Sequence, residues 1–125
     1  MLKVKTGPNG ARWKYFSGSM IDALERLNNV ANCFGPDITI TSAMDGKHAS
    51  DSRHHLCRAL DIRTSNLLKE DIMFLLVLLY DKFDEVPSFR IKIELDKANK
   101  YWIKPGDKLV FPKSRWLFQH LHIEW

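Results

Sequence analysis

The spacing of apolar residues in the first third of the chain predicts a helix. Apolar side chains recur at helical intervals over residues 20–31, and Gly35-Pro36 is expected to end the helix. Ser19 offers an N-cap, with Asp22 three residues later in the manner of a capping box. The first sixteen residues contain two turn signals, and we expect them to be irregular.

A second helix is predicted over residues 67–83, with Ser65 or Asn66 as its cap. Its apolar stripe is wide, so this helix should be largely buried. It contains the longest uninterrupted apolar run of the chain, Ile72 to Tyr80, which is nine residues long. A membrane-spanning helix needs about 20 such residues. We therefore expect a core helix and no membrane insertion.

The remaining apolar residues alternate with polar ones or are β-branched, which is typical of strands. The predicted strands cover residues 38–42, 59–63, 89–95, 101–103, 109–111 and 118–125. A turn at Pro105-Gly106-Asp107 separates two of them, and residues 104–115 are expected to form an extra hairpin or loop. The pattern predicts an α+β fold in which a small antiparallel sheet packs against two main helices.

Composition agrees with a single domain over residues 1–125. The chain is 45% hydrophobic and 27% charged, and its two cysteines are too few for a disulfide scaffold. The net charge of +4 favours anionic partners. Because lysines and arginines are spread along the chain, we expect a solvated basic surface and no nucleic-acid partner. No apolar stretch follows Met1, so no signal peptide is expected.

The five histidines lie in two short windows, which suggests a site assembled from two distant segments. The first window holds His48, His54 and His55, and the second holds His120 and His122. In a strand, residues two apart lie on the same side, roughly 6.5–7 Å from each other at the backbone. The predicted last strand therefore has a face with Leu121, Ile123 and Trp125 and a face with His120, His122 and Glu124.

The first window also contains two residues of types that commonly bind zinc. His54 and Asp61 are seven residues apart, and a third ligand could come from the His120-Leu-His122 segment. Three protein ligands with one open position is the arrangement of catalytic zinc sites.

The residues around His54 resemble a family motif. Ser52-x-His54-x-x-Cys57-x-Ala59-x-Asp61 is similar to the S-x-H-x-x-G-x-A-x-D motif of the zinc D-Ala-D-Ala carboxypeptidases. Their relatives include the vancomycin-resistance dipeptidases, phage L-alanyl-D-glutamate endopeptidases and the hedgehog signalling domain. The segment from His120 to Trp125 resembles the histidine-bearing strand that closes the site in this group. The likeness is closest to the phage branch.

The resemblance implies a hedgehog/DD-peptidase-like fold and roles for individual residues. His54, Asp61 and His122 would bind Zn²⁺, and His120 would polarise the substrate carbonyl or stabilise the oxyanion. The implied substrate is the D-amino-acid-containing stem peptide of peptidoglycan. We expect a monomeric enzyme that is made in the cytoplasm and acts at the cell wall after release, as a phage lysis enzyme does.

Two departures from the family pattern bear on activity. Cys57 stands where the family has Gly, which permits backbone angles that other residues avoid, and Cys57 could itself be a ligand. Gln119 stands where the family has an acidic general base, and an amide cannot take a proton at neutral pH. The candidates to replace that base are Glu94, Asp96, Glu124 and His120.

A third departure concerns the arginine with which many relatives hold the substrate carboxylate, because this chain has Met44-Asp45 there. Ser52, Arg53 and Arg63 are expected to contact the substrate, and Lys47 is a further candidate for its carboxylate. The extra segment before the last strand is the fourth departure. The tryptophans Trp102, Trp116 and Trp125 are expected to pack in the core or at a sheet edge.

The leading prediction is therefore a zinc metallopeptidase acting on peptidoglycan peptides, either a carboxypeptidase or an endopeptidase. The alternative is a non-catalytic zinc-binding module of the same fold, which Gln119 favours. A His-metal nuclease is suggested by the adjacent His54 and His55, but no Asn-containing ββα-metal signature surrounds them.

Overall fold

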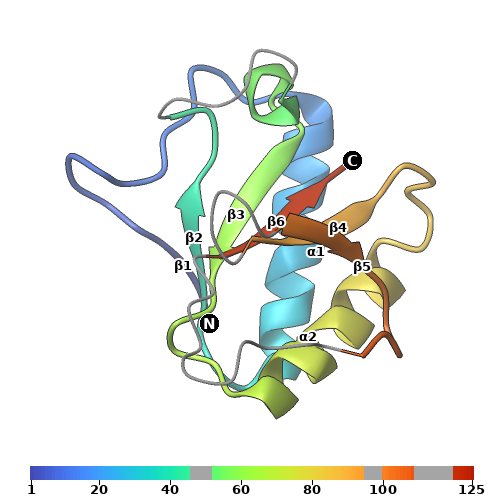
Figure 1. Ribbon diagram of the computed structural model, residues 1–125. Helices are drawn as coiled ribbons and strands as arrows, with labels where there is room; N and C mark the ends of the chain where they lie inside the picture. Colours follow the sequence, from blue (N-terminus) through green and yellow to red (C-terminus); the bar gives the residue numbers. More distant parts are fainter. Residues whose placement is uncertain (46–51, 95–99, 109–119) are drawn as a thin grey trace.

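Six strands and two helices make up most of the computed structural model, which describes residues 1–45, 52–94, 100–108 and 120–125. The strands are β1 (Leu2–Val4), β2 (Ile38–Ser42), β3 (Ala59–Arg63), β4 (Arg90–Glu94), β5 (Lys100–Ile103) and β6 (His120–Glu124). The helices are α1 (Gly18–Phe34) and α2 (Lys69–Lys82), and a short 3-10 turn, η1 (Arg53–Leu56), precedes β3. The result is a single small α+β domain (Figure 1).

The strands form one sheet in the order β1-β2-β3-β6-β4-β5. β1 runs parallel to β2, and the other neighbouring strands are antiparallel, so the sheet is mixed rather than antiparallel as expected. β6 follows every other described strand in the sequence, yet it lies between β3 and β4 in the middle of the sheet (Figure 1).

One face of the sheet is apolar and packs against both helices. Its fully buried side chains are Ile38, Ile40, Leu60, Ile62, Ile91, Ile93, Leu121 and Ile123. The helices contribute buried residues at helical spacing, among them Met20, Leu27, Val30, Ile72, Leu75 and Leu79. The alternation along each strand therefore separates a core face from a polar face, as the sequence predicted for the last strand.

Both helices begin at other residues than predicted. α1 is capped by Ser17 rather than Ser19, because Ser17 has the extended backbone of an N-cap and its hydroxyl accepts a hydrogen bond from Met20 N at 3.1 Å. α2 starts after Leu68, whose N–H donates to the Asp71 carboxylate at 2.9 Å. The predicted caps Ser65 and Asn66 lie in the preceding turn. Gly35 ends α1 as predicted.

The N-terminal residues were predicted to be irregular, and β1 contradicts this. Ile38 N donates to Met1 O at 3.0 Å, and Lys5 N donates to Ile40 O at 2.8 Å, which fixes the parallel pairing. An edge strand of three residues is too short to show a detectable alternation.

The other strand predictions are confirmed in the described residues, except that Phe89 and Trp125 lie just outside β4 and β6. The predicted turn is present, since Asp107 N donates to Lys104 O at 3.1 Å. The predicted strand 109–111 lies outside the described residues, as does most of the expected hairpin. None of the described helices combines the length and the apolar character that crossing a membrane requires.

Candidate metal centre

The polar face of the sheet carries functional side chains in register across four strands. Asp61 on β3 pairs with His122 on β6, and His122 pairs with Lys92 on β4. Lys92 pairs in turn with Trp102 on the edge strand β5. Register partners lie on the same face, so these residues form one row. The next row contains Arg63, His120, Glu94 and Lys100.

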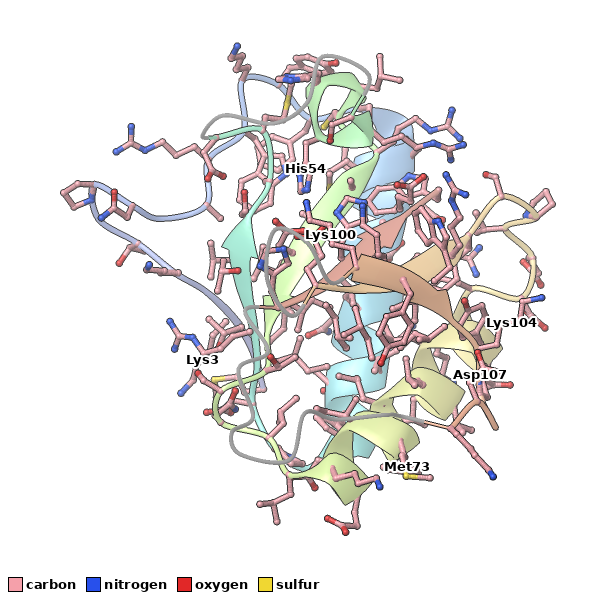
Figure 2. All side chains as sticks on the ribbon, viewed as in Figure 1. Lys3, His54, Met73, Lys100, Lys104 and Asp107 are labelled. Atoms are coloured by element: carbon pink, nitrogen blue, oxygen red, sulfur yellow. The ribbon has the colours of Figure 1, made fainter. Side chains whose placement is uncertain are left out.

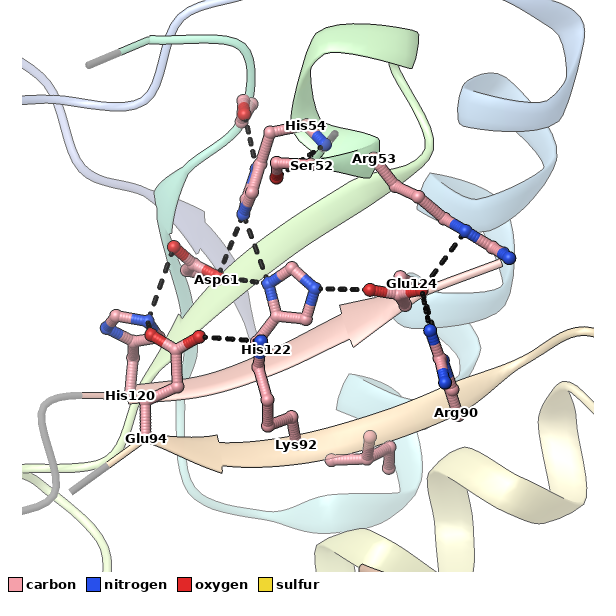
Figure 3. Close-up of polar contacts among 12 residues, drawn as sticks. Ser52, Arg53, His54, Asp61, Arg90, Lys92, Glu94, His120, His122 and Glu124 are labelled. Atoms are coloured by element: carbon pink, nitrogen blue, oxygen red, sulfur yellow. Dashed lines mark hydrogen bonds and ion pairs between the residues drawn. The ribbon is translucent and has the colours of Figure 1, made fainter. Parts of the chain in front are cut away.

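Three predicted ligands converge on this face (Figure 3). Asp61 Oδ1 lies 3.2 Å from His54 Nε2 and 3.0 Å from His122 Nδ1. The two imidazole nitrogens are 3.1 Å apart. All three residues are buried, and His54 and His122 are 68 residues apart in the chain.

His54 is oriented by the turn that carries it. Its backbone N–H donates to the Ser52 hydroxyl at 3.3 Å, which caps η1. Its ring Nδ1 lies 2.5 Å from Ala43 O. A carbonyl oxygen only accepts, so Nδ1 carries the proton and the lone pair of Nε2 faces the other two ligands.

His122 is oriented by Glu124, two residues along the same strand. His122 Nε2 donates to Glu124 Oε1 at 2.8 Å. Burial opposes the ionised form of Glu124, but the hydrogen bonds from His122 and Arg90 outweigh it and hold the pKa of this carboxyl below its usual range. The carboxylate therefore accepts the Nε2 proton, and the lone pair of His122 Nδ1 faces the centre.

The three inward atoms form a triangle that suits a bound metal ion. Burial alone would raise the pKa of Asp61, but its contacts with His122 and His54 hold that pKa well below the usual range, so the carboxylate is ionised. Three lone pairs then face one another in a buried space, and a cation among them would offset their mutual repulsion. Tetrahedral zinc with bonds of about 2.0–2.1 Å separates its ligand atoms by roughly 3.3 Å, close to the observed spacing. The group could hold a metal ion.

His120 and Glu94 form a second pair directly beside this triangle. His120 Nε2 lies 2.5 Å from Glu94 Oε2 and 3.4 Å from Asp61 Oδ2. Lys92 Nζ contacts the other oxygen of Glu94 at 3.3 Å. Burial lowers the pKa of His120, but the hydrogen bond to Glu94 and the charges of Asp61 and Glu94 reverse this and raise it. These contacts favour the protonated form of His120 beside the Glu94 carboxylate.

Arg53 and Arg90 surround Glu124 from two sides (Figure 3). Arg53 Nε lies 3.1 Å from Glu124 Oε2. Arg90 donates to the same oxygen through Nε and Nη2, both at 3.1 Å. Arg53, expected to contact substrate, thus also joins η1 to β6 behind the ligand His122.

Cys57 occupies the position where the motif that this segment resembles has Gly. The backbone conformation of Cys57 is one that favours Gly. Its φ of 56° and ψ of 39° lie in the left-handed region, where it closes η1 by donating its N–H to His54 O at 3.2 Å. Its buried thiol donates to Tyr15 O at 3.3 Å and is not part of the ligand group. The alternative of Cys57 as a ligand therefore gains no support.

The structure brings some of the other predicted residues to the site. The Ser52 hydroxyl is used to cap η1, and Arg63 is half-buried beside His120. Trp125 packs in the core and Trp102 lies on the edge strand β5, both as predicted, and 42% of the surface of Trp102 is exposed. The predicted site residues Gln119, His48, Lys47 and Asp96, together with Trp116, lie outside the described residues.

Sequence reasoning missed the partners that orient the ligands. The alternation of β6 placed Glu124 on the same face as His122, and this signal could have identified it as the partner of His122 rather than a base. Arg90 likewise shares the alternation of Lys92 and Glu94. Nothing in the sequence indicates that Ala43 contributes its carbonyl oxygen, because every residue carries one.

Comparisons with protein-family models, with curated proteins and with solved structures give no match for this chain.

Proposed function

We propose that this chain is a zinc metallopeptidase that cleaves D-amino-acid-containing peptide bonds of peptidoglycan stem peptides. The observation that carries the proposal is the convergence of His54, Asp61 and His122 beside the His120–Glu94 pair. A peptidase needs both parts, a metal site and a group that handles protons next to it. The substrate class rests on the resemblance of residues 52–61 and 120–125 to the zinc D-Ala-D-Ala carboxypeptidases.

The ligand set suits zinc, which commonly binds two imidazole nitrogens and one carboxylate oxygen. When bound, zinc supplies a Lewis acid that polarises a carbonyl and lowers the pKa of a water molecule. The protein contributes fixed ligands, since Ala43 and Glu124 hold the two imidazole rings in the tautomers that the metal requires.

His120 is proposed to act on the substrate through its Nε2 proton. This proton lies between Glu94 and Asp61, next to the ligand triangle, where it can be donated to a developing oxyanion or to the leaving amine. Burial would raise the pKa of Glu94, but the hydrogen bond and the charge of His120 lower it to about 2. A carboxylate this acidic is a weak base, so Glu94 is better suited to orienting His120.

Metal content and turnover test the proposal together. The protein should bind zinc at about one ion per chain, and the zinc-loaded form should release peptides from purified peptidoglycan sacculi. His54→Ala should lose both properties, whereas Asp84→Asn, in the loop after α2, should keep both. A zinc-loaded protein that releases no peptide would contradict the enzymatic function and leave the metal site intact.

The second candidate is a non-catalytic zinc-binding module of the same fold. Gln119 favours it, because the family has an acidic base at that position. One variant distinguishes the two candidate functions. If the unmodified protein is inactive on sacculi and Gln119→Glu gains activity, the chain is a binding module that lost its base.

The proposed cellular setting follows from the substrate. The enzyme would be made in the cytoplasm, reach the wall after release during phage lysis and act as a monomer. A net charge of +4 suits association with an anionic wall.

A further inference from the structure

The polar face on the β5 side of the candidate metal centre is basic. It continues through Lys92 and Lys100 to the exposed Trp102. On the β2 side, Ser42 and the carboxylate of Asp45 bond to each other at 3.1 Å, and Arg12, Trp13 and Lys14 lie beside Asp45. A ligand that extends from the centre towards β5 would therefore meet cations and an aromatic ring.

Trp102 is held rigidly although much of it is exposed. The guanidinium carbon of Arg90 lies 3.7 Å from the centre of its ring, and Lys92 Nζ lies 5.1 Å away. Arg90 is also bound to Glu124, so it links the ring to the residue that contacts His122. The ring lies 6.4 Å from the ring of His122. An exposed, fixed aromatic ring beside a metal centre is suited to stacking on a peptide plane.

Lys100 contributes the positive charge of this end. It is the register partner of Glu94, and Glu94 is the register partner of His120, so Lys100 lies in the same row of the polar face as that imidazole. In the described part of the chain it has no carboxylate partner, whereas Lys92 contacts Glu94 at 3.3 Å. Figure 2 shows Lys100 close to His54 in projection and Lys104 at the far end of β5.

We propose that Lys100 and Trp102 hold the anionic end of the substrate, a peptide residue that bears a carboxylate close to the scissile bond. Trp102 would stack on the peptide plane, and Lys100 would pair with the carboxylate. The inference rests on the proposed peptidase function and adds the charge that the substrate must carry. It assigns the binding of this carboxylate to β5 rather than to Arg63 of β3, the register partner of His120.

Matched peptides and matched lysines test the inference. The probe is the zinc-loaded full chain with the peptide L-Ala-γ-D-Glu-L-Lys-D-Ala-D-Ala, as the free acid and with either carboxylate converted to an amide. Lys100→Glu should raise KM at least tenfold for the acid, with little change for the amide that removes the recognised carboxylate. Trp102→Leu should raise KM for all three peptides. Lys104→Glu, the exposed control directly after the same strand, should leave KM unchanged for all three peptides.

The amide that abolishes the effect of Lys100→Glu identifies the carboxylate as C-terminal or as that of the D-Glu residue. Equilibrium binding of the three peptides to the zinc-loaded protein separates this inference from the proposed activity. Tighter binding of the acid that is lost in Lys100→Glu, without any cleavage, would support the inference and contradict the peptidase function. Equal binding of acid and amides, or an effect of Arg63→Glu in place of Lys100→Glu, would overturn the inference.

Discussion

At the scale of single residues, Cys57 shows a local conflict between backbone and side chain. Its left-handed backbone costs an L residue about 1–2 kcal/mol, which Gly avoids. Its side chain is nevertheless buried and contacts Tyr15 O. Burial of the Cys57 side chain offsets part of this backbone strain, which makes a residue other than Gly tolerable at this position.

Comparison of two variants isolates the backbone strain at Cys57. Cys57→Gly and Cys57→Ala both lose the thiol, but only Gly relaxes the backbone. We expect Cys57→Gly to be more stable than Cys57→Ala by about 1 kcal/mol in urea unfolding, the reverse of the order in ordinary helices. A more stable Cys57→Ala would show that the turn is not left-handed in solution.

Glu94 is the residue on which the proposed proton handling depends. In Glu94→Gln the amide can still contact His120 but carries no charge, so His120 should lose its proton more readily. We expect zinc content to remain and the rate of peptide release to fall by about 10²-fold or more. Glu70→Gln on the exposed side of α2 is the control. An unchanged rate in Glu94→Gln would remove Glu94 and its pairing with His120 from the mechanism.

At the scale of elements, the end of β2 is held by one carboxylate. Asp45 Oδ1 accepts from Ala43 N at 2.7 Å and from Arg12 N at 2.9 Å, and Oδ2 accepts from Ser42 at 3.1 Å. These bonds hold the turn whose Ala43 oxygen orients His54. Burial opposes ionisation, but the hydrogen bonds lower the pKa of Asp45 below its ordinary value.

The lowered pKa makes the contribution of Asp45 depend on pH. A carboxyl group with a lower pKa in the folded state stabilises the fold above its unfolded value of about 3.9, and this contribution is lost as the pH falls through the folded value. Asp45→Asn should therefore be less stable than the unmodified protein by about 1 kcal/mol at pH 7, with a gap that narrows below pH about 4. Urea unfolding of both proteins at pH 7 and below pH about 4 measures this difference in stability. A gap that does not change with pH would contradict this role.

Glu124 joins the strands β6 and β4 and the turn η1. Its substitution tests how His122 is oriented. Glu124→Gln removes the charge that both Arg53 and Arg90 contact and weakens the acceptor of the His122 proton. We expect zinc affinity to fall about 10-fold or more, measured by competition with a chelator, because outer partners of ligating histidines have effects of this size. Glu85→Gln, in the turn after α2 and paired with Arg26 of α1, is the control. Unchanged affinity would show that His122 keeps its orientation without this carboxylate.

Structure could be predicted from the sequence where a residue pattern is compatible with only one kind of element or site. β3 and β6 were predicted because their alternation is regular, and the convergence of His54, Asp61 and His122 because a spaced motif contains the first two and the second histidine window contains the third. β1 was missed because three residues are too few to show a pattern, and its parallel pairing made the sheet mixed. The tautomer of His54 could not be predicted, since it depends on a backbone oxygen that only the folded turn brings near.

At the scale of the whole molecule, the ligand triangle links three separate parts of the fold. Its atoms come from η1, β3 and β6, so a metal ion that binds them stabilises the folded state alone. Zinc at about 100 times its dissociation constant should add roughly 2.7 kcal/mol to the free energy of unfolding and raise Tm. Calorimetry with and without zinc measures the shift. The same shift in His54→Ala would show that zinc binds elsewhere.

The position of β6 has a consequence for when the site can exist during synthesis. A nascent chain makes α1, β2, β3 and α2 before residues 120–124 appear, yet these residues fill the middle of the sheet. Until then β3 and β4 have no common neighbour, and the triangle lacks His122. A ribosome-bound chain that stops before residue 120 therefore has no complete metal site. If the protein degrades the wall, its producer is protected from each molecule until that molecule's final described strand has been made.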